Sequence, residues 1–67
     1  MEAAEAKNLT VGQTIRFNDG RPGHNAKAVV LEVAESRMLV QFEDRADTTT
    51  IGFADRAWMD HLSVEKN

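Results

Sequence analysis

Apolar side chains recur at every second position in short runs of this sequence, and this period constrains the fold more than any other feature. In residues 11–17, the side chains of Val11, Ile15 and Phe17 share one face. Residues 38–43 repeat the pattern. A two-residue period places alternate side chains on opposite faces of an extended chain, which is typical of a half-buried β-strand. The sequence therefore predicts a mostly β fold.

Three further segments complete a predicted set of five strands. Residues 26–34 are the longest apolar run, and their β-branched residues favour a strand with apolar side chains on both faces. Residues 48–53 form a threonine-rich strand, and residues 62–64 form a short last strand. Between these two, residues 54–61 have helical composition and room for one or two turns, with Asp55 in position to cap them.

The inward positions of these strands define the expected core. Residues 26–34 and 38–43 are separated by a short connection, so we expect them to pair as an antiparallel hairpin. The expected core residues are Val29, Leu31, Val40, Phe42 and Ile51.

The chain has 67 residues and no cysteine, which predicts one small domain without disulfides or thiolate metal sites. We place the domain at residues 11–64, between a flexible or short-helical N-terminal tail (1–10) and a C-terminal tail (65–67). The N-terminal residues are acidic, and no apolar run approaches the roughly 20 residues that a membrane span needs. The predicted location is therefore cytoplasmic, without membrane contact.

Charge and motif content argue against several classes of protein. The formal net charge is −3, which does not favour binding to phosphate backbones. The two histidines, His24 and His61, lack the spacing of metal ligands. No phosphate-binding glycine loop, nucleophile–base set or paired-carboxylate site is present in the sequence. We therefore expect a non-catalytic protein that needs no cofactor and no metal.

Five short strands with a helical turn before the last one resemble a small SH3-like barrel. Four segments carry a further resemblance: IRFNDG (15–20), AKAVV (26–30), VQFEDRAD (40–47) and TI (50–51). They resemble the segments of a Tudor domain, in which an aromatic residue ends the first strand and an Asp-Gly loop follows it. The resemblance spans roughly residues 11–62 and implies a five-stranded antiparallel barrel.

Tudor domains resemble one another in holding methylated lysine or arginine in an aromatic cage, because π faces attract a cation that is easily desolvated. By position, the resemblance implies that Phe17 and Phe42 supply two cage walls. Ala26 and Arg45 stand at the other two wall positions, and Asp47 replaces the closing asparagine. An arginine at a wall of the cage repels a cationic ligand.

Loop length points to the binding surface. Residues 18–25 form a loop of eight residues with two glycines and a proline, whereas hairpin loops usually have about 2–5 residues. We expect residues 44–47 to lie beside it, and loops on a rigid barrel commonly carry binding groups. The predicted function is therefore a protein-interaction module that uses these loops. The candidate partner-binding residues are Arg21, His24, Arg45, Phe17, Phe42 and Trp58.

Two alternatives to this function stay open at the level of the sequence. The arginines on the same loops would serve a DNA- or RNA-binding protein, and Arg21 and Arg45 at neighbouring loop tips would form an acid-recognising pair. The apolar faces carrying Val29 and Val30 would serve a protein that assembles into homo-oligomers. For the aromatic residues, the structural interpretation is that Phe17 and Phe42 belong to the core and that Trp58 closes one end of the barrel.

Overall fold

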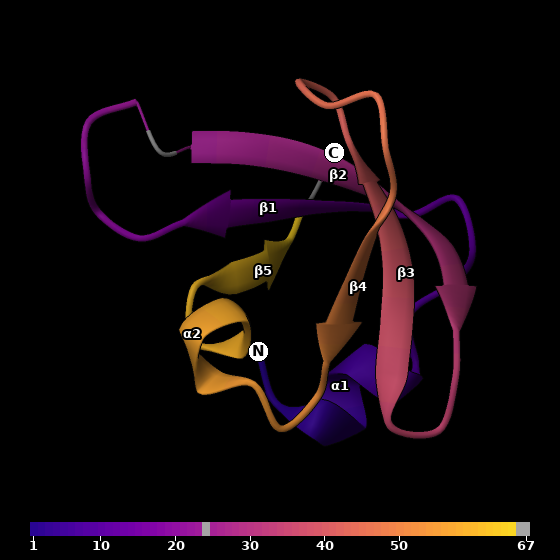
Figure 1. Cartoon of the computed structure of the whole chain (residues 1–67). Helices are drawn as coiled ribbons and strands as arrows, with labels where there is room; N and C mark the ends of the chain where they lie inside the picture. Colours follow the sequence, from indigo (N-terminus) through magenta and orange to yellow (C-terminus); the bar gives the residue numbers. More distant parts are fainter. Residues whose placement is uncertain (24, 66–67) are drawn as a thin grey trace.

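The computed structural model describes residues 1–23 and 25–65. One antiparallel sheet of five strands, in the order β4-β3-β2-β1-β5, forms most of the molecule (Figure 1). The strands are β1 (Thr14–Asn18), β2 (Asn25–Val33), β3 (Arg37–Phe42), β4 (Thr49–Gly52) and β5 (Leu62–Val64), and the helices are α1 (Ala3–Lys7) and α2 (Arg56–Met59). The predicted mostly β fold, its five antiparallel strands and the helical turn before the last strand are confirmed.

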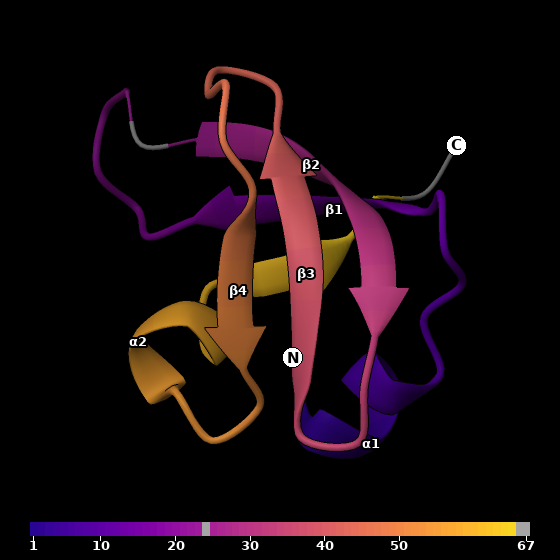
Figure 2. The ribbon, with the colours of Figure 1, turned by 45° about the vertical axis from the view of Figure 1, so that its right-hand side comes forward.

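The sheet bends strongly, so that β1 and β5 lie across β3 and β4 (Figure 2). Strand β2 takes part in both halves, because it pairs with β1 and with β3. The predicted β2–β3 hairpin is therefore confirmed. In the described part of the chain, no ladder joins β4 to β5, and the sheet stays open at these two edge strands.

The core lies inside this bend and receives side chains from every strand. Of the expected core residues, Val40, Phe42 and Ile51 are buried. Both helices add to the core, since α1 contributes Ala6 and α2 contributes Met59. The other buried apolar residues are Leu9, Ile15, Ala28, Val30, Met38, Phe53 and Leu62.

Two residues of the predicted core lie elsewhere. Leu31 is 40% exposed, and Val29 is only half-buried. The inner positions of β2 belong to Ala28 and Val30, and the register with β3 shifts directly after Val30. A bulge of this kind inserts an extra residue into one strand. Leu31 takes that place, after which Val33 packs against the core again. The prediction that Val29 and Leu31 belong to the core was therefore wrong.

The first strand begins later than predicted. Strand β1 starts at Thr14, and Val11 lies in a turn before it with 63% of its surface exposed. Gly12 has φ +93°, a left-handed conformation that glycine adopts at little cost. Its N–H donates to the carbonyl oxygen of Val30 at 2.7 Å. The segment before β1 therefore contacts β2 through a turn and does not extend the strand. The alternation of apolar residues did not indicate this turn.

The N-terminal segment is helical and docked. Ala6 and Leu9 are buried in the core, and the amino group of Met1 donates to the carbonyl oxygen of Met59 at 2.6 Å. At the other end, Glu65 is held by its N–H, which donates to the carbonyl oxygen of Thr14 at 3.0 Å. The rest of the predicted C-terminal tail lies outside the described residues. Within those residues, neither helix has the length and apolar surface to cross a bilayer.

Candidate functional site

Strand pairing brings two phenylalanines to the same end of the sheet. Phe17 is the direct partner of Ala26 across β1 and β2, and Phe42 is the direct partner of Ala28 across β2 and β3. The two alanines are small, so they leave space on the inner face of β2 between the two rings. Helix α2 places Trp58 against this space, and Trp58 and Phe17 both pack against the core.

The three aromatic rings form one cluster. The ring centroid of Trp58 lies 5.1 Å from that of Phe17, with an interplanar angle of 60°, and 5.7 Å from that of Phe42. His61 adds an edge-on contact to Phe17 at 5.8 Å. These separations are in the range in which aromatic pairs attract one another. Phe42 is buried, whereas Phe17 and Trp58 are half-buried and keep part of their surfaces accessible.

A hollow of about 80 Å³ opens beside this cluster. We call it the aromatic pocket. Pockets for cofactors and drug-sized ligands usually have about 300–1,000 Å³, so this one suits a single apolar side chain rather than a cofactor. The lining residues are Phe17, Ala26, Phe42, Asp44, Arg45 and Trp58.

Helix α2 is short, and its capping residue fixes the position of Trp58. The carboxylate of Asp55 accepts a hydrogen bond from the N–H of Ala57 at 3.1 Å, which confirms the predicted cap. The carbonyl oxygen of Asp55 accepts from the N–H of Trp58 at 3.2 Å and of Met59 at 2.9 Å. An ordered α2 keeps the indole ring against the two phenylalanines.

Arg45 lies at the rim of the pocket in the connection between β3 and β4. Its guanidinium carbon is 5.9 Å from the centroid of the Phe42 ring, within cation–π range. Gln41 holds the backbone of this loop, because its Nε2 donates to the carbonyl oxygens of Arg45 at 2.6 Å and Asp47 at 3.2 Å. The aromatic pocket therefore has a cation at its edge on a loop with a defined conformation.

The predicted pair of Arg21 and Arg45 is not assembled at this pocket. The side chain of Arg21 is 75% exposed, lies 4.0 Å from the Asp19 carboxylate and does not line the pocket. The carboxylate of Asp19 also accepts a hydrogen bond from the N–H of Arg21 at 3.0 Å, which shapes the loop. His24, another predicted partner-binding residue, lies outside the described residues. Of the predicted partner-binding residues, four therefore line the aromatic pocket and Arg21 does not. The four are Phe17, Phe42, Trp58 and Arg45.

Sequence reasoning did not assign Asp44 and His61 to this site. Asp44 lines the pocket, and His61 packs edge-on against Phe17. Ala26 was noted only as a departure from an aromatic position, yet its small side chain opposite Phe17 opens the hollow. The strand register is the signal that would have revealed this, and the hydrophobic pattern alone does not specify it.

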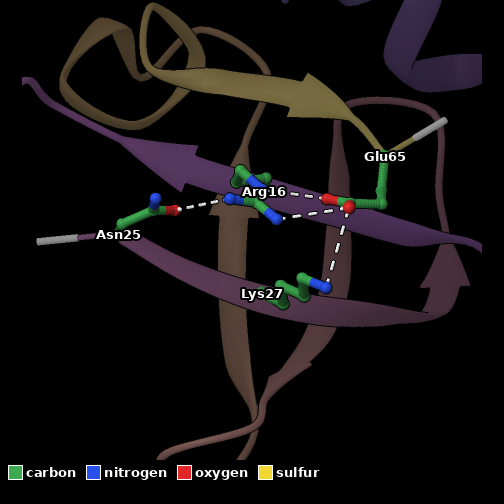
Figure 3. A network of polar contacts seen from close by, with 4 residues as sticks. All are labelled: Arg16, Asn25, Lys27 and Glu65. Carbon is green, nitrogen blue, oxygen red and sulfur yellow. Dashed lines mark hydrogen bonds and ion pairs between the residues drawn. The ribbon is translucent and has the colours of Figure 1, made fainter.

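The outer face of the sheet carries a separate cluster of polar side chains (Figure 3). The guanidinium of Arg16 donates to the carboxylate of Glu65 at 2.9 and 3.2 Å and to the side-chain oxygen of Asn25 at 3.3 Å. The ammonium of Lys27 lies 3.6 Å from the same carboxylate. Hydrogen bonding to Arg16 lowers the pKa of Glu65, and the same bond raises the pKa of Arg16. These two cations therefore share one carboxylate within the chain.

Among the described residues, no group of three His, Cys, Asp or Glu side chains has the arrangement of a metal site. Comparison with known proteins gives no further guide: no family model, no curated protein and no solved structure matches this chain.

Proposed function

We propose that the chain is a non-catalytic binding module that receives an apolar side chain of a protein partner in the aromatic pocket. The observation that carries this proposal is the position of Phe17, Phe42 and Trp58 around one hollow, with two of the rings partly accessible. A rigid aromatic pocket binds a side chain with little loss of its own conformational entropy. Tryptophan is also among the residues most enriched at the centres of protein interfaces.

We also propose that the fold is an SH3-like barrel of the Tudor-like type. Support comes from the strand order, in which β5 lies beside β1, and from α2 between β4 and β5. Phe17 and Phe42 fall at the two cage positions that the resemblance implies, but the third ring is Trp58 from α2. Arg45 beside the pocket opposes a methylated cation, so we do not propose that this module reads methyl marks.

A protein partner has more support than a nucleic acid. In the described part of the chain, Arg16, Arg21 and Arg56 each lie within 4.0 Å of a carboxylate. Phosphate neutralisation supplies most of the affinity of non-specific nucleic-acid binders, and cations that are already paired contribute less to it. The alternative of assembly through Val29 and Val30 also has less support, because Val30 is fully buried.

The test fills the pocket without removing any aromatic ring. Ala26→Leu places a larger side chain in the hollow beside Phe17, whereas Ala34→Leu makes the same change at an exposed position directly after β2. Wild type and both variants are labelled with ¹⁵N and titrated with a pool of short peptides, with RNA and with DNA. Circular dichroism confirms that each variant is folded.

We expect peptides to shift the amide signals of Phe17 and Phe42 and the indole signal of Trp58 in the wild type and in Ala34→Leu. Ala26→Leu should lose these shifts. Shifts that appear only with RNA or DNA, and that decrease steeply as salt increases, would contradict the proposal and support the nucleic-acid alternative.

A further inference from the structure

In the described part of the chain, Arg45 has no carboxylate partner, as is also true of Arg37 at the start of β3. Among the described residues, Arg16, Arg21 and Arg56 form ion pairs with Glu65, Asp19 and Asp60, respectively. The guanidinium of Arg45 lies over the Phe42 ring, with its carbon 5.9 Å from the ring centroid. Its N–H donors are therefore available at the edge of the aromatic pocket.

A guanidinium held by a cation–π contact keeps its hydrogen-bond donors for another ligand. Its planar fork of N–H groups matches the two oxygens of a carboxylate. The loop that carries Arg45 is held by the two hydrogen bonds from Gln41, at 2.6 and 3.2 Å. Less conformational entropy is then lost when the arginine binds a ligand. The indole N–H of Trp58 is a second donor without a hydrogen-bond acceptor in the described residues.

A second hollow, of about 290 Å³, adjoins the aromatic pocket at Ala26 and Asp44. It opens beside Arg16 and Lys27, which lie on the outer face of the sheet. Asn25 and Glu43 also line it. An internal peptide segment that inserts an apolar side chain in the aromatic pocket would pass Ala26 and Asp44 to reach this hollow, which a chain end would not do.

From these observations we propose that the partner is a peptide segment in which an Asp or Glu side chain neighbours the apolar anchor, and that Arg45 binds its carboxylate. This inference rests on the proposed function, because the anchor occupies the aromatic pocket. Asp44 lines the same pocket, and its negative charge repels the acidic side chain of the peptide. Substitutions of Asp44 and Arg45 should therefore change affinity in opposite directions.

The experiment uses four short peptides with one shared anchor. Three have blocked ends and the sequences Gly-Phe-Glu-Gly, Gly-Phe-Gln-Gly and Gly-Phe-Lys-Gly, and the fourth is N-acetyl Gly-Phe with a free terminal carboxylate. Dissociation constants are measured from the indole and amide shifts of the labelled protein. The titrations are repeated for Arg45→Gln and Asp44→Asn, each of which removes the charge and keeps a polar side chain.

We expect the glutamate peptide to bind about three- to tenfold more tightly than the glutamine peptide, which is the typical net effect of one hydrogen bond at a solvent-exposed site. Arg45→Gln should remove this preference, and Asp44→Asn should increase it. The peptide that ends in a free carboxylate should bind more weakly than the glutamate peptide. Its carboxylate is the chain terminus of the anchor residue itself, whereas the proposed ligand is the side chain of a neighbouring residue.

Three results would overturn the inference. Equal binding of the glutamate and glutamine peptides at the pocket would refute it and leave the proposed function standing. Tightest binding of the lysine peptide, with Arg45→Gln improving it, would show that the pocket selects a cation. If no peptide shifts the signals of the pocket residues, the inference and the proposed function both fail.

Discussion

Arg16 and Lys27 are direct cross-strand partners on β1 and β2, so two cationic side chains meet at one register position on the outer face of the sheet. Like charges at such a position repel one another. The carboxylate of Glu65 lies 2.9 Å from the Arg16 guanidinium and 3.6 Å from the Lys27 ammonium, and it follows directly after β5 (Figure 3). Glu65 therefore links the last strand to the first two, because its one negative charge lies between the two cations and reduces their repulsion.

The first prediction concerns the pH dependence of this link. The folded-state pKa of Glu65 lies below its ordinary value of 4.5, because the ionised carboxylate accepts hydrogen bonds from Arg16. Its contribution to stability is therefore present above the unfolded-state pKa and is lost as the pH falls through the lower folded-state value. Glu65→Gln should lower the melting temperature slightly at pH 7, and the difference from the wild type should vanish under acid conditions.

Thermal unfolding between pH 7 and pH 2.5 checks this, with Glu35→Gln as the control. Glu35 is exposed in the turn between β2 and β3, so its variant should follow the wild type throughout. High salt should also reduce the effect of Glu65→Gln, because it screens exposed charges. A difference between wild type and Glu65→Gln that grows as the pH falls would contradict the assigned role.

The second prediction tests the two faces of β2. Val30 is fully buried and Leu31 is 40% exposed, although the two residues are adjacent in an apolar run. Val30→Ala should lower the free energy of unfolding by about 1–3 kcal/mol, because it leaves a cavity in the core. Leu31→Ala should cost less than about 1 kcal/mol. Urea unfolding measures both values. A larger loss of unfolding free energy for Leu31→Ala than for Val30→Ala would contradict this assignment and support the core predicted from the sequence.

The third prediction concerns the docked N-terminal segment. Leu9 is buried after α1, whereas Val11 is 63% exposed two residues later. Leu9→Ala should lower the free energy of unfolding by about 2 kcal/mol or more. Val11→Ala should change it by about 0.5 kcal/mol or less. If urea unfolding gives the same small value for both variants, the packing of this segment contributes little to stability in solution.

The sequence predicted the fold better than the site, and β2 explains why. Two-residue alternation and turn-forming residues located the five strands, because those signals are local. The bulge after Val30 is set by pairing with β3, which no local pattern reports, and it moved Leu31 to the surface. Register also determines that Ala26 faces Phe17. Phe17, Phe42, Trp58 and Arg45 were named as candidates, but their assembly into one pocket depends on these long-range pairings.

The final prediction concerns Gln41 of β3, whose side chain binds the backbone of the loop between β3 and β4 that carries Arg45. Its Nε2 group is directed at the carbonyl oxygens of Phe42, Arg45 and Asp47 at distances of 3.2, 2.6 and 3.2 Å. Gln41→Met keeps a similar shape and removes these donors, so we expect a stability loss of only about 1 kcal/mol. The loop should become less ordered, because its carbonyls lose their shared partner.

Amide hydrogen exchange and peptide titration separate this effect from general destabilisation. The exchange of the Arg45 amide, which donates to the carbonyl oxygen of Phe42 at 3.2 Å, should accelerate in Gln41→Met while strand amides in β1 and β2 stay protected. The preference for the glutamate peptide should decrease as well, because Arg45 is no longer held beside Phe42. Gln13→Met is the matched control, since Gln13 accepts a hydrogen bond from Thr10 in a turn before β1. If both variants alter the Arg45 amide and the peptide preference equally, Gln41 has no special role in holding this loop.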